Sequence, residues 1–185
     1  MSKTLMATVQ RGWSLVELLT VMSILLILSS LALPSFRAMR HQMQVRNTTH
    51  EFASWLALAR SEAIMRRTGR VVMCVASSDK ACDQQGDWRK GWLLFHDLNG
   101  NARLDAEDTV IRYSPGLPLG LRATGNTPVA RYVAYVPSGR TLLVSGGLQM
   151  GTWSFCHEHS QTVGRQLVLN AAGRVRMAHW TPDSC

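Results

Sequence analysis

The sequence predicts an α+β protein in which one long N-terminal helix packs on a largely antiparallel β-sheet head domain. Three observations predict this class: an almost uninterrupted apolar stretch near the N-terminus, helical periodicity in the residues after it, and short β-type segments separated by turn residues in the rest of the chain. The chain has 185 residues, of which 46% are hydrophobic. This size allows one modest core and one appended helix, and a second large domain would not fit.

The apolar stretch covers residues 15–33 and is interrupted only by Glu17, Thr20 and a few serines. At about 1.5 Å per residue, a helix of this length just crosses a bilayer core of roughly 30 Å. Lys3 and Arg11 precede the stretch, which favours a cytoplasmic N-terminus. A cleaved secretory signal is the alternative, but its cleavage site would follow the apolar stretch, whereas the candidate processing point here precedes it.

Glu17 is the unusual residue of this stretch, because an ionisable carboxylate inside an apolar span is costly unless it has a partner. Such a residue is usually functional, and we expect a functional role for Glu17. The alternative, that Glu17 reaches back to the headgroups from one turn inside the helix, stays open.

The helix is expected to continue past Pro34, with a kink there, and to become amphipathic over residues 35–69. One helical face carries apolar residues at positions i, i+3, i+4, i+7 and i+11, and Gly69 is the expected end. These apolar residues are Phe52, Trp55, Leu56, Ala59 and Ala63. The whole helix would hold about 50 residues and measure roughly 75 Å.

Residues 70–185 are expected to form the head domain. The β-type segments are residues 70–76, 92–96, 129–136, 141–144, 153–157, 166–169 and 174–177. Glycine, proline, asparagine and aspartate separate them, as in an antiparallel sheet that receives the apolar face of the helix.

The chain contains four cysteines, which suits an oxidising compartment after an export signal. Proximity in the sequence favours the pairs Cys74 with Cys82 and Cys156 with Cys185. Two other connectivities, and free cysteines, remain open.

We predict no metal site, no cofactor and no enzyme activity. His157 and His159 would share a strand face opposite to Cys156, which spoils a zinc site that would also use His179 and Cys185. The segment 97–108 places oxygen side chains as a calcium loop does, but its pattern is imperfect and a polar Asn-Gly turn is favoured. The sequence contains no phosphate loop, nucleophile motif or zincin helix.

The formal charge of +8 favours anionic partners. Period-two alternation would place Arg174 and Arg176 on one strand face, with the spacing needed to contact successive phosphates of nucleic acid without sequence preference. Arg165, Arg131 and Arg140 are candidates to widen this patch. The alternative is an ordinary edge strand whose arginines prevent aggregation.

The segment from Arg11 to Leu18 resembles the processing signal of type IV prepilins and pseudopilins: a glycine, a hydrophobic residue, a few small or apolar residues, then glutamate and leucine. The resemblance implies that residues 1–12 are a cytoplasmic leader, that prepilin peptidase cleaves between Gly12 and Trp13, and that Trp13 becomes N-methylated. Trp13 differs from the usual phenylalanine or methionine. By the same resemblance, Glu17 meets the N-terminal amine of a neighbouring subunit, and residues 13–34 serve as both membrane span and assembly helix.

The rest of the chain resembles the GspH/FimT family of pilin-like minor pilins and pseudopilins. The segments that carry the resemblance are LARSEAI at 58–64, VVMC at 71–74, WRKGWLLF at 88–95 and DLNGN at 97–101. The resemblance implies a single-pass protein of the bacterial inner membrane with a periplasmic head, which later joins a pilus or pseudopilus and contacts other pilins or pseudopilins.

Two functions follow from this resemblance. In FimT-like proteins, a GRxR motif like the one at 173–176 is associated with DNA binding during uptake, so DNA is a candidate partner. The alternative is the minor pseudopilin H of type II secretion, which acts at the pseudopilus tip through protein contacts.

Overall fold

The computed structural model describes residues 14–77, 80–182 and 185, with the side chains of residues 31, 34 and 160–163 excepted. The chain forms two compact units, Met1–Met39 and Arg40–Cys185. The described part of the first unit consists of residue 14 and the beginning of helix α1. The second unit, called the head, contains the rest of α1 and all the strands.

Helix α1 covers Leu15–Arg66 and is 52 residues long. It continues without interruption through position 34, so the proline there does not end it. It ends at Arg66, short of the expected Gly69, because Arg67 already has a positive φ of 61°. The long helix predicted from the sequence is therefore confirmed, with an earlier end.

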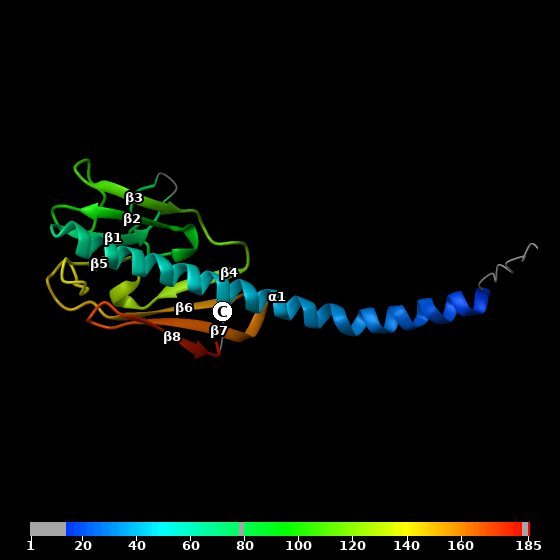
Figure 1. Cartoon of the computed structure of the whole chain (residues 1–185). Coiled ribbons are helices and arrows are strands. Elements are labelled where there is room, and N and C mark those ends of the chain that lie inside the picture. The colour runs from blue at the N-terminus through cyan, green and yellow to red at the C-terminus, as the bar shows by residue number, and fades with distance from the viewer. Residues whose placement is uncertain (1–13, 78–79, 183–184) are drawn as a thin grey trace, which may run out of the picture. The chain divides into compact units, whose positions relative to one another are not determined.

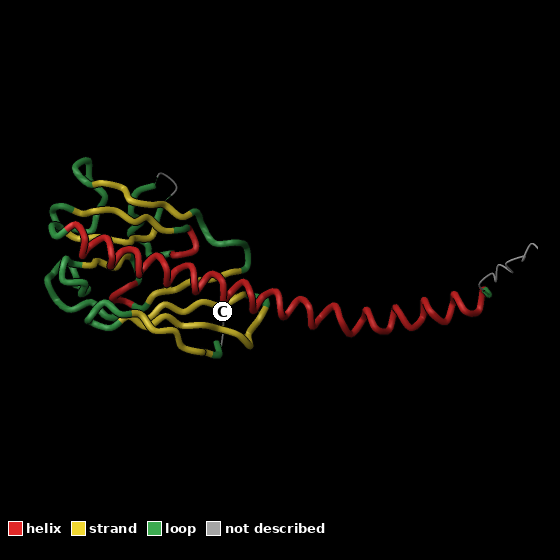
Figure 2. The backbone as a smooth tube through the Cα atoms, viewed as in Figure 1, coloured by secondary structure: helices red, strands yellow, loops and turns green. Residues whose placement is uncertain are grey.

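In the described part of the chain, eight strands form two antiparallel sheets of four strands each, on either side of α1 in Figures 1 and 2. The first has the order β3-β2-β1-β5, and the second has the order β4-β6-β7-β8. The strands of the first sheet are β1 (Arg70–Val75), β2 (Trp92–Asp97), β3 (Thr109–Ser114) and β5 (Tyr132–Tyr135). Those of the second are β4 (Leu121–Gly125), β6 (Gly151–His157), β7 (Ser160–Leu169) and β8 (Val175–Trp180).

Several strand predictions need correction. Strands β3 and β4 were not expected, and β3 is mostly exposed, so it has no buried face. Residues 141–144 make only isolated bridges, to Tyr135 and Leu148. The expected strand at 129–136 is shorter, because its beginning belongs to the 3-10 helix η2 (Thr127–Val129). A second 3-10 helix, η1, covers Trp88–Lys90.

The head has one principal core, to which α1 and both sheets contribute. Phe52 of α1 lies at its centre, with ring centroids of Trp88, Trp92, Trp153 and Phe155 at 5.0–5.3 Å. The amphipathic face predicted for the helix is confirmed, since its members are buried: Phe52, Trp55, Leu56, Ala59 and Ala63. A smaller cluster covers the other face of the first sheet, around Val72, Leu93 and Phe95.

Candidate functional site

The processing residues Gly12 and Trp13 lie outside the described residues. Glu17 stands in the first turn of α1 and is exposed. Its backbone N–H donates to Ser14 Oγ at 3.2 Å, which makes Ser14 the N-terminal cap of the helix. A carboxylate in this turn also lies at the positive end of the helix dipole. This capping role of Ser14 was not predicted from the sequence.

Helix α1 contains an 18-residue window with a mean hydropathy of 2.3, and none of this window is buried. By length and composition it could cross a membrane. The exposed apolar side chains run from Leu15 through Leu28.

The turn between β7 and β8 positions the two arginines expected to contact DNA. Gly173 has a φ of +73°, its N–H donates to Asn170 O, and a Cβ at this position would collide with the carbonyl oxygen of Gly139. The N–H of Arg174 donates to Asn170 Oδ1 at 3.0 Å. The glycine before the arginines is therefore required by backbone conformation and by close packing against a second turn.

Arg174 and Arg176 are both exposed. Arg176 pairs with Val168 in the β7–β8 ladder, while its neighbour Val175 packs against the core, so Arg176 faces away from the core. No ion pair within the described ranges involves either arginine.

The three other candidate arginines, Arg165, Arg131 and Arg140, do not lie together in the structure. Arg165 pairs with His179 and shares a sheet face with the buried Leu167, two positions along β7. It therefore lies on the opposite sheet face from Arg176 and does not widen the patch around Arg176. Arg131 lines a different cavity, beside Cys82 and Arg103. Arg140 is exposed and follows Gly139, whose carbonyl meets the β7–β8 turn.

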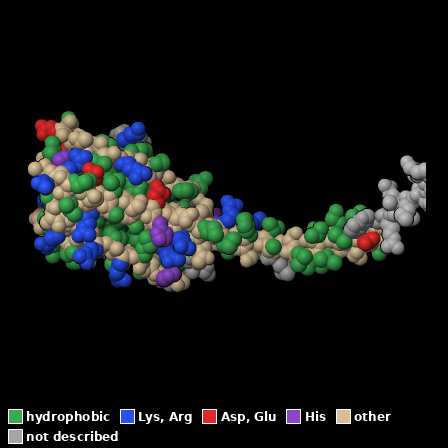
Figure 3. Space-filling model, viewed as in Figure 1, with side chains coloured by type: hydrophobic (Ala, Val, Ile, Leu, Met, Phe, Trp, Pro, Cys, Tyr) green, Lys and Arg blue, Asp and Glu red, His purple; other side chains and the backbone are tan. Residues whose placement is uncertain are grey.

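Arg60 of α1 belongs to the same end of the head and was missed in the sequence. Its Nε donates to Gly139 O at 3.0 Å, and it lines a groove together with Arg174. We call this the α1–β8 groove. Its wall residues are Ala53, Leu56, Ala57, Arg60, Ser61, Ile64, Tyr135, Gly173, Arg174 and Val175. On the face of the head shown in Figure 3, Lys and Arg side chains outnumber Asp and Glu, with apolar atoms between them.

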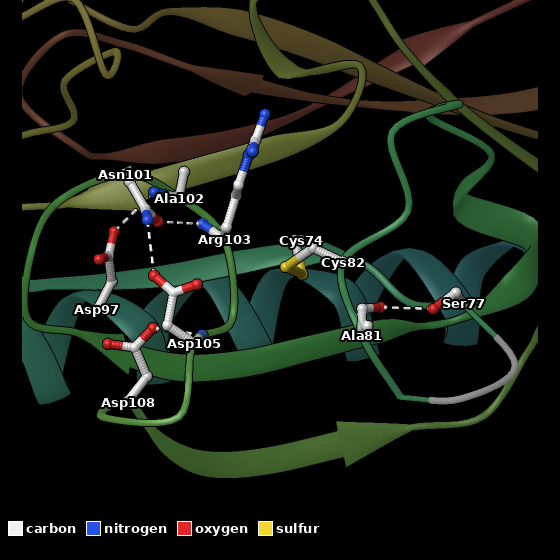
Figure 4. Close-up of a disulfide and its surroundings, with 10 residues drawn as sticks. All are labelled: Cys74, Ser77, Ala81, Cys82, Asp97, Asn101, Ala102, Arg103, Asp105 and Asp108. Carbon is white, nitrogen blue, oxygen red and sulfur yellow. Dashed lines mark hydrogen bonds between the residues drawn. A yellow bond between two sulfur atoms is a disulfide. The ribbon is translucent and has the colours of Figure 1, made fainter.

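The head contains two disulfides with the pairing favoured by the sequence. Cys74 bonds to Cys82 across eight positions, and Cys156 bonds to Cys185 across 29. The first appears in Figure 4, beside the hydrogen bond between Ser77 and the carbonyl of Ala81.

The histidines near Cys156 form a ring cluster in which His41 of α1 takes part. The rings of His41 and His157 stack with centroids 3.9 Å apart, and His159 lies 5.6 Å from His157. Burial, and then the nearby His41 and His159, lower the pKa of His157. The described residues contain no group of three or more side chains suited to hold a metal ion.

The loop 97–108 uses its carboxylates internally (Figure 4). The Asp97 oxygens accept from the N–H groups of Gly100 and Ala102, at 2.7 and 2.9 Å. Asp105 Oδ2 accepts from the side-chain amides of Asn99 and Asn101, which lowers its pKa. Carboxylates bonded in this way close a polar turn, the arrangement favoured by the sequence.

Comparisons with known proteins define the class. The profile of the family described as "Type II transport protein GspH" matches residues 48–173. The solved structure of the type IV minor pilin FimU from Pseudomonas aeruginosa superimposes with a TM-score of 0.57 at 21% identity, over 76% of this chain and 94% of that one. A second crystal form of FimU gives 0.53, with 76% and 98% covered. No curated protein sequence gives a significant match.

The minor pseudopilin EpsH of the type 2 secretion system of Vibrio cholerae has a TM-score of 0.49 at 13% identity, over 74% of this chain and 97% of that one. The fold, one N-terminal helix packed on antiparallel sheets, is pilin-like. The profile match covers more than half of the chain, and the chain belongs to the GspH family. It is a minor pilin or pseudopilin, a class that associates with other pilins or pseudopilins, and its apolar N-terminal helix is consistent with membrane anchoring.

Proposed function

We propose that this chain is a minor subunit of a type IV pilus that captures DNA without sequence preference, and that α1 incorporates it into the filament. Prepilin peptidase would cleave after Gly12, Trp13 would become N-methylated, and Glu17 would compensate the amine of a neighbouring subunit. Before assembly, the chain would span the inner membrane once, with the head in the periplasm. The apolar, exposed beginning of α1 supports this route.

The observation that carries the DNA proposal is the exposure of Arg174 and Arg176 at one end of the head, without an acidic partner among the described residues. Exposed guanidiniums two positions apart suit phosphate oxygens, and such contacts carry no sequence information. Binding should therefore be weak, tolerant of sequence and steeply dependent on salt.

The test uses the full chain in neutral detergent and a fluorescent DNA duplex, titrated at several salt concentrations. We expect the double variant Arg174→Gln, Arg176→Gln to weaken binding at every sequence tested. The slope of log affinity against log salt should fall by about 2, since each lost phosphate contact removes about 0.9.

The matched control is Arg103→Gln with Arg131→Gln, which removes the same charge from the cavity beside Cys82. An equal loss in this control would show that only net charge matters. Absence of binding by the unchanged protein at low salt would exclude DNA capture. The function would then be the second candidate, a pseudopilin H that acts at the pseudopilus tip through protein contacts, and a secretion defect would be its measurable phenotype.

A further inference from the structure

The α1–β8 groove is a cavity of about 550 Å³ between one flank of α1 and the start of β8. Ala53, Ala57 and Ser61 line the helical wall, and their short side chains leave room beside the helix. Gly173, Arg174 and Val175 form the opposite wall. Half of the lining residues have aliphatic side chains, so the groove suits a ligand with an apolar part.

Tyr135 lies in the wall of this groove, and its side chain is fully buried. Its hydroxyl has no hydrogen-bond partner among the residues that the structure describes. Burial raises the pKa of the phenol, so it stays protonated and remains a hydrogen-bond donor. A buried hydroxyl normally has a partner, so this phenol is an unusual part of the wall, and its burial makes the ring a sensitive reporter of changes in the groove.

The remaining polar groups at the groove are also mainly donors. Arg60 uses its Nε on Gly139 O, which leaves its two terminal nitrogens for another acceptor. Arg174 borders the groove from the other side. The lining contains no acidic residue, and neither arginine forms an ion pair with a described residue. Two arginines therefore border a cavity with an apolar wall, to which the buried Tyr135 belongs, and this arrangement complements an anionic acceptor on an apolar stem.

The strand beside the groove has an unpaired edge. Strand β8 is the last strand of its sheet and pairs only with β7 within the described residues. Such an edge can accept an extended segment of another protein through backbone hydrogen bonds, while alternate side chains of that segment enter neighbouring pockets.

We propose that the α1–β8 groove binds a glutamate side chain of an extended segment from another filament subunit, which lies along β8. The choice of partner rests on the proposed assembly function. The carboxylate meets Arg60 and Arg174, and its methylene stem lies against the aliphatic side chains and the buried Tyr135 of the wall. The aliphatic lining favours a carboxylate on such a stem over a phosphate diester, which has no apolar stem of this kind.

The experiment labels the full chain in neutral detergent with [13Cζ]tyrosine. The chain has three tyrosines, so three resonances are expected, and Tyr135→Phe assigns the one in the groove. The probes are hexanoate and a short acetylated peptide of alternating valine and threonine with one central glutamate. Both should shift the Tyr135 resonance and leave Tyr113 and Tyr132 unchanged. Arg60→Gln and Arg174→Gln should each weaken hexanoate binding about tenfold.

Three controls make the outcome decisive. Hexanamide and the glutamine version of the peptide lack the charge and should leave Tyr135 unshifted. Arg131→Gln, outside the groove, should bind hexanoate as well as the unchanged protein. If Arg60→Gln disturbs Tyr113 and Tyr132, Arg60→Lys replaces it, and should bind hexanoate more weakly because lysine lacks the planar fork.

The proposal is overturned if hexanoate leaves Tyr135 unshifted, or if hexanamide shifts it equally. If hexanoate binds and the glutamate peptide does not, the proposal that an extended partner segment lies along β8 is overturned. A shift produced by a short single-stranded oligonucleotide but not by the peptide would assign the groove to nucleic acid instead. The hexanoate titration contains no DNA. A negative result in it would therefore overturn the groove proposal and leave the proposal of DNA capture to its own experiment.

Discussion

His157 is a buried imidazole that stacks on His41, with only 4% of its surface exposed. The close approach of Gly120 to the ring leaves little space around it. His41, His159 and Glu158 are the titratable groups that face it, and Glu158 also pairs with Arg122. Burial and the two neighbouring imidazoles together oppose the protonated form, and Glu158 offsets them only in part.

The lowered pKa of His157 predicts that the head loses stability in mild acid. Above the unfolded pKa of about 6.5, both states are neutral at this residue and the contribution is complete. As the pH falls below that value, the unfolded chain binds a proton that the folded chain resists, so the free energy of unfolding decreases. Thermal unfolding between pH 7.5 and 5 should show this decrease. In His157→Phe, the free energy of unfolding should change less over the same pH range.

The control for this pH dependence is His179→Phe, because His179 is exposed and contacts Arg165. This variant should retain the pH dependence of the unchanged protein. An equally steep loss of stability in His157→Phe would show that other groups are responsible.

The exposure and the bonding partner of single residues were predictable where residues nearby in the sequence determine them. Exposure of Arg176 follows from strand alternation, and proximity along the chain favoured the two cysteine pairs. Arg60 and Tyr135 could not be placed beside Arg174, because packing of α1 against two different sheets creates that neighbourhood. The facing of Arg165 was mistaken for the same reason, since it depends on the register of β7 against β8.

At the level of elements, periodicity was most informative where one face of an element is buried. The helical pattern around Phe52 is regular, so the buried face of α1 could be predicted. Strand β3 is an edge strand whose Val110 and Tyr113 are exposed, so it has no buried face that could give a comparable signal. Its presence is explained by pairing with β2, an interaction between segments that local sequence does not reveal.

The aromatic contacts of Phe52 predict that α1 is the central support of the head. Phe52→Ala would leave a cavity between α1 and both sheets and should lower the free energy of unfolding by about 3–5 kcal/mol. Denaturant unfolding of the full chain in detergent, followed by tryptophan fluorescence, measures this loss. Phe36→Ala is the control, since Phe36 is exposed and belongs to the first unit. A loss below about 1 kcal/mol for Phe52→Ala would contradict the central role of this ring.

At the scale of the whole molecule, apolar surface is distributed unevenly between the two units. The head buries its large aromatic side chains, whereas the described apolar side chains of the first unit are exposed from Leu15 onward. Exposed apolar surface of this extent requires lipid or neighbouring helices as cover. A subunit that passes from a membrane into a filament has both.

We expect the carboxylate of Glu17 to be required when the subunit moves from the membrane into a filament. We expect Glu17→Leu to be cleaved and retained in the membrane, but to enter filaments about tenfold less, because the amine of its neighbour would lose its partner in apolar surroundings. Immunoblots of sheared filaments and of membranes measure the two pools. Ser23→Ala, a polar change in the same stretch, should assemble normally. Normal assembly of Glu17→Leu would leave helix capping as the role of that first turn.

The disulfide between Cys156 and Cys185 has a topological consequence for the second sheet, which contains β7 and β8. It closes a covalent ring that contains the whole of β7 and the whole of β8, the strand at the free edge. Two copies of the chain cannot exchange β8 while this ring is closed, although swapping of edge strands is a common route to unwanted dimers. A single proteolytic nick inside the ring would likewise leave both fragments attached. The edge can therefore stay open to a partner without becoming detachable from its own sheet.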